Sequence, residues 1–182
     1  MKAKLKVNNV SVNLGFKELE LIADVLPDCE ENAMIFHELS KSLSSEVRTA
    51  VACKTSLMAE TAELLIQDSS IMVLCQILKT DIGMASLNKR ELTRFIELGS
   101  VRLLKMMIMG LDDIVNEFDC CDMKYLVDLL VQHQDPLIRF ELAGAGCGIP
   151  LCYLKILADD PDKSVVLEAQ QALIDLDFDC DF

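Results

Sequence analysis

Three stretches of the chain repeat one plan of helix start, and this repetition constrains the fold more than any other feature. They begin at Ser44, Asp135 and Asp162, residues whose side chains can cap a helix. Each start is followed three residues later by an apolar residue and four residues further on by another, which places both on one helix face. The apolar pairs are Val47 with Val51, Ile138 with Leu142, and Val165 with Ala169.

Weaker copies of this plan begin at Asp68 and Gly99. The first apolar residues of the five copies are Val47, Met72, Val101, Ile138 and Val165, spaced 25, 29, 37 and 27 residues apart. Repeats of this length are typical of a solenoid, in which each repeat packs only on its neighbours. The widest interval, 37 residues, leaves room for one extra helix.

Short amphipathic segments fill most of the chain from Phe16 onward. Helices of about two to four turns are unstable alone in water, so they must bury an apolar face against neighbours. The sequence therefore predicts an all-α protein, a right-handed α-solenoid of short helices. The expected helices cover residues 16–26, 31–43, 45–52, 59–66, 70–79, 89–98, 101–109, 112–118, 123–132, 136–143, 151–158 and 161–175.

The two ends of the chain differ from this pattern. Residues 1–15 alternate apolar with polar side chains, and Asn8-Asn9 suits a two-residue turn, so we expect a short β-hairpin or an extended arm. This arm would cap the helical-repeat domain of residues 16–174 or join two copies as a homodimer. In residues 175–182 Asp alternates with apolar residues, which fits an acidic tail and a terminal strand equally well.

The first strong copy carries a longer motif, made of Val47, Arg48, Val51, Ala52, Leu57, Glu60, Leu64 and Asp68, and a second version follows Asp135. This motif resembles the repeat of the leucine-rich repeat variant family and is similar to HEAT-like repeats. The first kind stacks an α-helix and a shorter, often 3₁₀, helix, and the second stacks two α-helices. The Asn-Pro of the family is replaced by Lys54-Thr55 and by Ala145-Gly146. The resemblance implies a binding surface rather than a reaction.

Acidic residues are concentrated in the second half of the chain. Residues 1–90 hold 12 Asp and Glu against 10 Lys and Arg, whereas residues 91–182 hold 18 against 7. Such a half attracts basic proteins and repels phosphate backbones, so we expect a protein partner of basic character and no direct nucleic-acid contact. The candidate partner-binding residues are Asp112, Asp113, Glu117, Asp119 and Asp122.

A second hypothesis treats the acidic half as a nucleic-acid mimic that inhibits a DNA- or RNA-binding enzyme. Mimicry requires carboxylates in rows on one face, where they can take the place of phosphates. A scaffold that binds a protein through several contacts has no such requirement. Surface geometry therefore separates the two hypotheses.

Residues typical of catalysis are sparse. His37 and His133 are the only histidines, and neither stands in a motif with a nucleophile. A glycosylase or lyase on helical repeats would need a basic cleft or a reactive thiol in a pocket, which an acidic chain without Trp does not suggest. We expect a protein-interaction scaffold rather than an enzyme, with no catalytic residue and no cofactor.

The eight cysteines do not follow the spacing of metal sites, since Cys120 and Cys121 are adjacent and Cys147 and Cys152 lie five residues apart. No secretory signal or membrane-spanning stretch is visible. We therefore expect mostly reduced, buried thiols, no metal, no membrane contact and a cytoplasmic location.

Three arginines, Arg48, Arg102 and Arg139, follow the first apolar residue of their copies. They suit either a ladder that binds an acidic ligand or a structural role, in which each arginine bonds carbonyls and acids of the adjacent repeat. The structural role is the prediction, because an arginine fork can tie neighbouring backbone segments together while its stem covers apolar surface.

Overall fold

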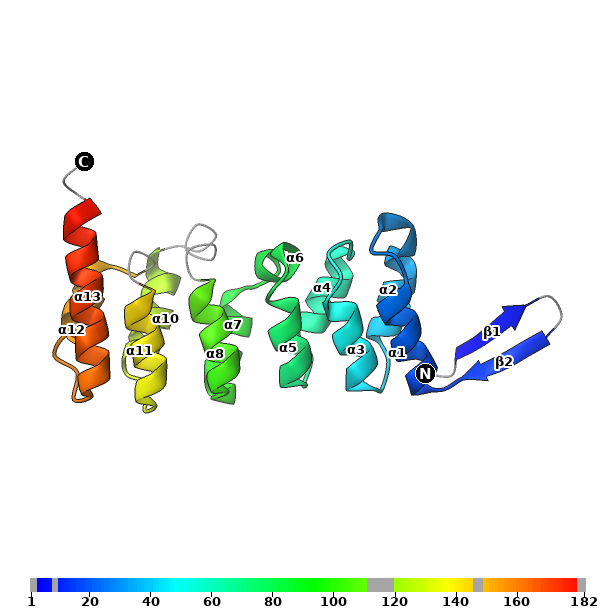
Figure 1. The fold of residues 1–182 in the computed structure, drawn as a ribbon, viewed down its shortest axis with the longest axis horizontal. Coiled ribbons are helices and arrows are strands. Elements are labelled where there is room, and N and C mark those ends of the chain that lie inside the picture. The colour runs from blue at the N-terminus through cyan, green and yellow to red at the C-terminus, as the bar shows by residue number, and fades with distance from the viewer. Residues whose placement is uncertain (1–2, 8–9, 111–119, 146–148, 180–182) are drawn as a thin grey trace. The chain divides into compact units, whose positions relative to one another are not determined.

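Helices account for almost all regular structure in the described part of the chain (Figure 1), so the predicted all-α class is confirmed. The computed structural model describes the backbone of residues 3–7, 10–110, 120–145 and 149–179, and the side chains of residues 4, 11–110, 124–145 and 149–176. The helices are α1 (Phe16–Val25), the 3₁₀ helix η1 (Glu30–Asn32), α2 (Ala33–Ser40), α3 (Ser45–Ala52), α4 (Ala59–Ile66), α5 (Ile71–Ile77), α6 (Asp81–Ala85), α7 (Lys89–Leu98), α8 (Val101–Met109), α10 (Cys120–Val131), α11 (Pro136–Gly144), α12 (Leu151–Leu157) and α13 (Lys163–Asp179).

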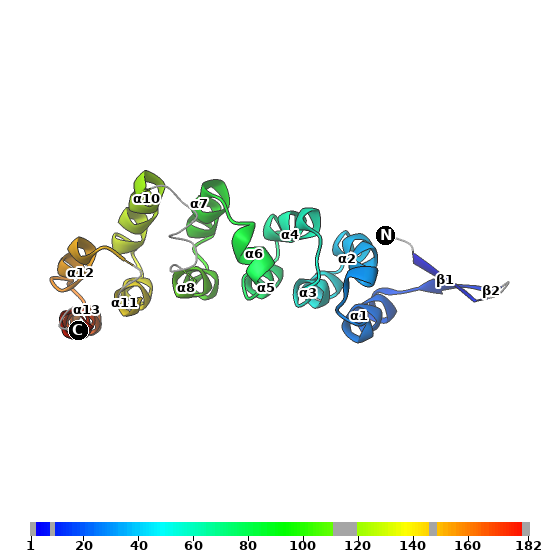
Figure 2. The ribbon, with the colours of Figure 1, turned by 90° about the horizontal axis from the view of Figure 1, so that it is seen from above.

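The chain divides into two compact units, Met1–Ser86 and Leu87–Phe182, where the sequence suggested one helical-repeat domain. In the first unit α1, α3 and α5 lie side by side in one layer, and α2, α4 and α6 form a second layer against them (Figure 2). Each helix thus contacts a neighbour in its own layer and one in the other layer.

The second unit has the same two-layer order. Helices α8, α11 and α13 are successive neighbours in one layer, and α7, α10 and α12 form the other. The core of each unit lies between its layers. Because every helix is short, these contacts rather than helix propensity stabilise it.

One burial register recurs in the first-layer helices that follow Ser44, Ser70, Ser100, Asp135 and Asp162. The third residue after each cap and the residue four positions later are at most 1% exposed. Burying a Val, Leu, Ile or Met side chain contributes about 1.5–3 kcal/mol, and the methyl group of Ala169 contributes less. The expected residues Met72 and Val101 were wrong, because Met72 is 50% exposed and Val101 is half-buried. The buried pairs are Val47 and Val51, Val73 and Ile77, Leu103 and Met107, Ile138 and Leu142, and Val165 and Ala169.

The N-terminal segment is a hairpin and not a single extended arm. Strand β1 (Ala3–Val7) pairs antiparallel with β2 (Val10–Leu14), with Val7 opposite Val10. A two-stranded hairpin is marginal on its own, and β2 contacts α1. The hairpin therefore belongs to the first unit.

The described helices differ from the predicted pattern in three main places. The segment expected at 31–43 is split into η1 and α2, and α6 lies where no helix was expected. Helix α13 continues through Asp179, so residues 175–179 are helical rather than a tail or strand. The helix expected at 112–118 lies outside the described residues.

Candidate functional site

Arg48 and Arg139 make the same set of contacts in the two units. Arg48 donates from Nε and Nη2 to the two carboxylate oxygens of Asp68, at 2.5 and 3.0 Å, and from Nη1 to the carbonyl of Ser42 at 2.8 Å. Arg139 donates in the same way to Asp160, at 2.7 and 2.9 Å, and to the carbonyl of His133 at 2.6 Å.

The two aspartates extend this arrangement into the start of the next repeat. Asp68 accepts the backbone N–H of Ser70 at 2.7 Å, and Asp160 accepts that of Asp162 at 2.8 Å. Each arginine thus ties the loop before its own helix to the loop that opens the next one. The structural role predicted for these two arginines is confirmed, and both are occupied within the fold rather than available to an acidic ligand.

Arg102 does not stand in the same register. Arg48 and Arg139 are the fourth residues after their caps, Ser44 and Asp135, whereas Arg102 is the second residue after Ser100. The apparent match rested on Val101, which is not the buried residue of α8. Grouping Arg102 with the other two was therefore wrong.

Lys54 follows the C-terminal end of α3 and reaches the C-terminal end of α1. Its ammonium donates to the carbonyls of Asp24 and Leu26, each at 3.1 Å, and lies 5.5 Å from the centre of the Phe36 ring. The C-terminus of a helix carries partial negative charge, and an aromatic face attracts a cation. The first unit therefore neutralises the end of α1 with its own lysine.

Asp28 fixes the loop that follows Lys54. Its carboxylate accepts the backbone N–H groups of Thr55 and Ser56, at 2.7 and 2.8 Å. Burial raises the pKa of Asp28, but the hydrogen bonds together lower it by more, so the pKa lies below its usual value. Lys54 and Thr55 thus both have local partners in the fold.

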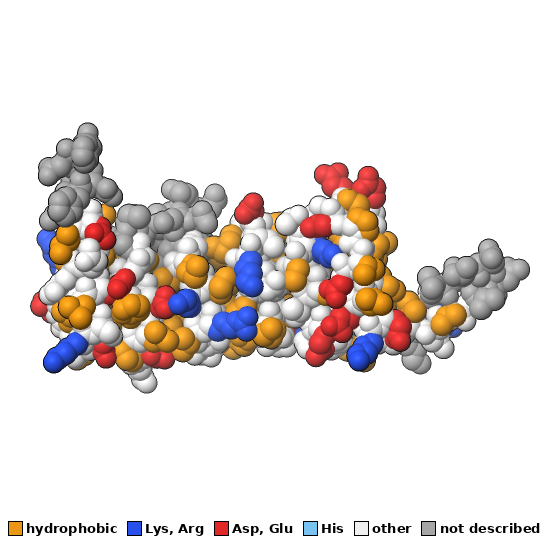
Figure 3. All heavy atoms as spheres, in the orientation of Figure 1, with side chains coloured by type: hydrophobic (Ala, Val, Ile, Leu, Met, Phe, Trp, Pro, Cys, Tyr) orange, Lys and Arg blue, Asp and Glu red, His pale blue; other side chains and the backbone are white. Residues whose placement is uncertain are grey.

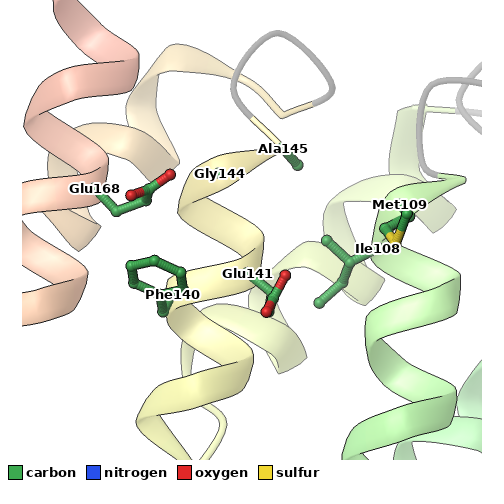
Figure 4. Close-up of a pocket in the computed structure, with 7 residues that line it drawn as sticks. All are labelled: Ile108, Met109, Phe140, Glu141, Gly144, Ala145 and Glu168. Carbon is green, nitrogen blue, oxygen red and sulfur yellow. The ribbon is translucent and has the colours of Figure 1, made fainter.

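A hollow of about 410 Å³ opens across the C-terminal ends of α8 and α11 in the second unit. Glu141 and Ile108 point into the space between α11 and α8, whereas Phe140 and Glu168 lie on the side of α11 that faces α13 (Figure 4). We call this site the hollow. Its lining residues are Ile108, Met109, Phe140, Glu141, Gly144, Ala145 and Glu168.

The charges of the hollow are mainly negative. Glu141 is paired with Lys105 at 2.5 Å, whose side chain is 48% exposed. Among the described residues no cation pairs with Glu168, whose carboxylate lies so close to Gly144 that an added Cβ would stand 3.1 Å from it. The C-terminal ends of α8 and α11 add partial negative charge. With an aromatic ring and apolar walls beside it, the hollow suits a cationic group on an apolar stem.

Glu141 and Glu168 were not among the candidate residues from the sequence. The residues that were proposed, Asp112, Asp113, Glu117 and Asp119, lie outside the described residues. Asp122 falls within the backbone of α10, and its side chain lies outside the description. The signal that identifies the hollow is the packing of α8, α11 and α13, which no run of acidic residues reveals.

The two histidines have local partners. His37 Nδ1 lies 2.9 Å from the hydroxyl of Thr61, and His133 Nδ1 accepts the backbone N–H of Asp135 at 3.1 Å. Tyr153 donates to Asp128 at 2.8 Å, and burial followed by this contact raises the pKa of Tyr153 to about 12. These contacts join helix ends and neighbouring helices.

Of the four cysteines with described side chains, only Cys75 is buried. Cys53 and Cys152 are exposed and Cys29 is half-buried, so the expectation of mostly buried thiols was wrong for this set. In the described ranges no three His, Cys, Asp or Glu side chains are arranged to hold a metal ion. None of the described helices is both long and apolar enough to cross a bilayer.

Comparison of the chain with protein-family models, with curated proteins and with solved structures finds no match in any of the three.

Proposed function

We propose that the chain is a protein-binding module of the α-solenoid type, and that the second unit engages a basic partner through the hollow. The observation that carries the proposal is the joint presence of Glu141, Glu168 and two helix C-termini around one cavity. Charge of one sign in a concave site draws in ligands of the opposite sign. The proposal assigns no reaction to the chain.

The two-layer stacking within each unit supports a repeat architecture similar to the leucine-rich repeat variant and HEAT-like proteins, and the right-handed turn of the solenoid is part of the proposal. Both layers of each unit are built from α-helices. The second helix of a repeat pair is also an α-helix, as α4 after α3 and α12 after α11 show. Two α-helices per repeat is the HEAT-like plan, and it leaves helix ends and loops along the edges of the stack for binding.

The nucleic-acid mimic receives no support from the visible face. Over α8, α11 and α13 the Asp and Glu side chains stand singly among apolar and basic ones rather than in rows (Figure 3). A groove that binds a phosphate backbone requires charges at regular intervals. We therefore favour a protein partner over the mimic.

Affinity capture from the host tests the proposed function. The whole chain is used as bait at low and high salt, next to a Glu141→Gln/Glu168→Gln variant. We expect a defined partner that the wild type retains at high salt and that the variant loses, because neutral amides keep the shape of the hollow and remove its charge.

A matched control carries Glu60→Gln and Glu63→Gln, two exposed carboxylates on α4 in the first unit. This control should capture the same partner as the wild type. Recovery only of generically basic proteins, and only at low salt, would contradict a specific scaffold. Equal capture by all three chains would remove the hollow from the proposal.

A further inference from the structure

The two units differ at one equivalent position, and the difference indicates what the hollow binds. Lys54 is the tenth residue after the cap Ser44, and Ala145 is the tenth residue after the cap Asp135. The helices α3 and α11 that follow these caps share their buried residues and their arginine contacts. Counted from the N-cap, Ala145 therefore stands where the first unit has a lysine. Helix α11 ends one residue later than α3, so Ala145 is the C-cap residue of α11, whereas Lys54 follows the C-cap of α3.

The surroundings correspond as well. Lys54 bonds the end of α1, the layer neighbour that precedes α3, and α8 is the layer neighbour that precedes α11. Leu19 and Ala23 are the buried pair of α1, and Leu103 and Met107 are the buried pair of α8. When these pairs are aligned, Asp24 corresponds to Ile108. Ile108 lines the hollow, as the carbonyl of Asp24 lines the site of Lys54.

We propose that the hollow is the open counterpart of the Lys54 site, and that it takes a lysine side chain from a basic segment of a partner protein. This rests on the proposed function and names the group recognised. The first unit supplies the ammonium itself, whereas in the second unit alanine leaves the space to an incoming lysine. Phe140, the aromatic residue of the hollow, lies on the side of α11 that faces α13 and does not take the place of Phe36 beside the end of α8 (Figure 4).

The chemistry of the hollow fits a lysine. The ammonium is a compact charge that can be held by oxygens arriving from several directions, whereas arginine is held best by a planar, bidentate partner such as those already engaged by Arg48 and Arg139. Glu168 supplies a carboxylate, Glu141 shares its charge with Lys105, and Ile108 and Met109 can pack on the apolar stem.

The test is a titration of the whole, isotope-labelled chain with acetyl-Gly-Lys-Gly-amide, followed by NMR shifts of backbone amides. We expect saturable shifts at Met109, Gly144 and Ala145. The same peptide with an acetylated lysine side chain keeps the stem and loses the charge, and should bind at least about tenfold more weakly, the equivalent of about 1.4 kcal/mol.

The decisive variant is Ala145→Lys, which installs the lysine of the first unit. Its side chain should fill the hollow from within and abolish the saturable shifts. The control Gln132→Lys adds the same charge at an exposed position before α11 and should bind as the wild type does. Glu168→Gln, which needs no new packing, should weaken binding and serves as a second variant.

Three results of the titration would overturn the proposal: no saturable shift at the three amides, equal binding by Ala145→Lys, or tighter binding of spermidine than of the peptide. The last would make the hollow a polyamine site. If a specific partner is captured equally well by wild type and Ala145→Lys, the protein-binding function survives and the lysine pocket does not.

Discussion

At the scale of residues, the bidentate arginines decide how helix pairs are joined. The Arg139 side chain is 11% exposed and that of Asp160 6% exposed, and the pair is supported by hydrogen bonds on both sides. Removing one partner of such a pair leaves a charge without compensation, which costs more than the intact pair contributes.

Arg139→Lys should lower the free energy of unfolding by about 1–2 kcal/mol, because an ammonium cannot donate in parallel to both oxygens of Asp160 while also reaching the carbonyl of His133. Urea unfolding followed by circular dichroism measures the change. The control Arg90→Lys, at an exposed position of α7, should stay within about 0.5 kcal/mol of the wild type. Equal losses in the two variants would contradict the role assigned to the fork.

The same pair predicts a dependence on pH. Hydrogen bonds from Arg139 lower the pKa of Asp160, against the opposing effect of burial. Because the folded pKa lies below the unfolded value of about 3.9, the stabilisation is fully present above that value and is lost as pH falls through the folded pKa. The advantage of wild type over Asp160→Asn should be constant above about pH 5 and shrink below about pH 4. An advantage that persists unchanged to about pH 2 would count against an ionised Asp160 in the fold.

At the scale of elements, α6 shows what close approach requires. A Cβ added to Gly83 would stand 2.0 Å from the carbonyl oxygen of Ile77, so no other residue fits without moving the backbone. Gly83→Ala should destabilise the first unit by about 1–3 kcal/mol or shift α6 away from α5. Thermal unfolding measures the loss. Gly144→Ala is the matched control, since its Cβ meets only the flexible side chain of Glu168 at 3.1 Å, and a loss as large as that of Gly83→Ala would refute the packing argument.

The position of Ala145 gives a second prediction at this scale. Ala145→Lys should raise the free energy of unfolding by about 0.3–1 kcal/mol at low salt, because its ammonium would neutralise the end of α8 as Lys54 does for α1. Ala145→Gln has a similar length and no charge, and should give no increase. The gain should shrink at high salt. A lysine variant less stable than the glutamine variant would show that the two positions are not equivalent.

Much of the helix pattern could be predicted from the sequence, because capping residues and apolar spacing agree locally. Helices α3, α4, α7 and α8 have the predicted bounds. Helix α6 was missed because five residues are too few to show a period, although Thr80 caps it by accepting the N–H of Gly83 at 3.1 Å. At the C-terminus, alternation of Asp with apolar residues fitted an acidic tail and a strand equally well. Helical spacing is also present there, at Ala172, Leu173 and Leu176, and helix α13 continues through Asp179.

At the scale of the whole molecule, the candidate site could not be predicted, since it joins residues from three helices. Met109, Glu141 and Glu168 are 32 and 27 residues apart and meet only because α8, α11 and α13 are neighbours in one layer. The charge count pointed to the half of the chain that holds the hollow, but to other carboxylates. The repeat alignment had already placed Lys54 and Ala145 at equivalent positions. The sequence did not show that the space beside Ala145 is open, because that space depends on the packing of three helices.

The central claim is that the second unit binds a basic partner through the hollow. Zero-length carbodiimide cross-linking of the captured complex, followed by mass spectrometry, tests it most directly, because the reagent joins a carboxylate only to an amine in contact with it. The account predicts an amide between a partner lysine and Glu141 or Glu168, absent when the bait is Ala145→Lys. Partner lysines joined only to carboxylates of the first unit, such as Glu60 and Glu63, would contradict it.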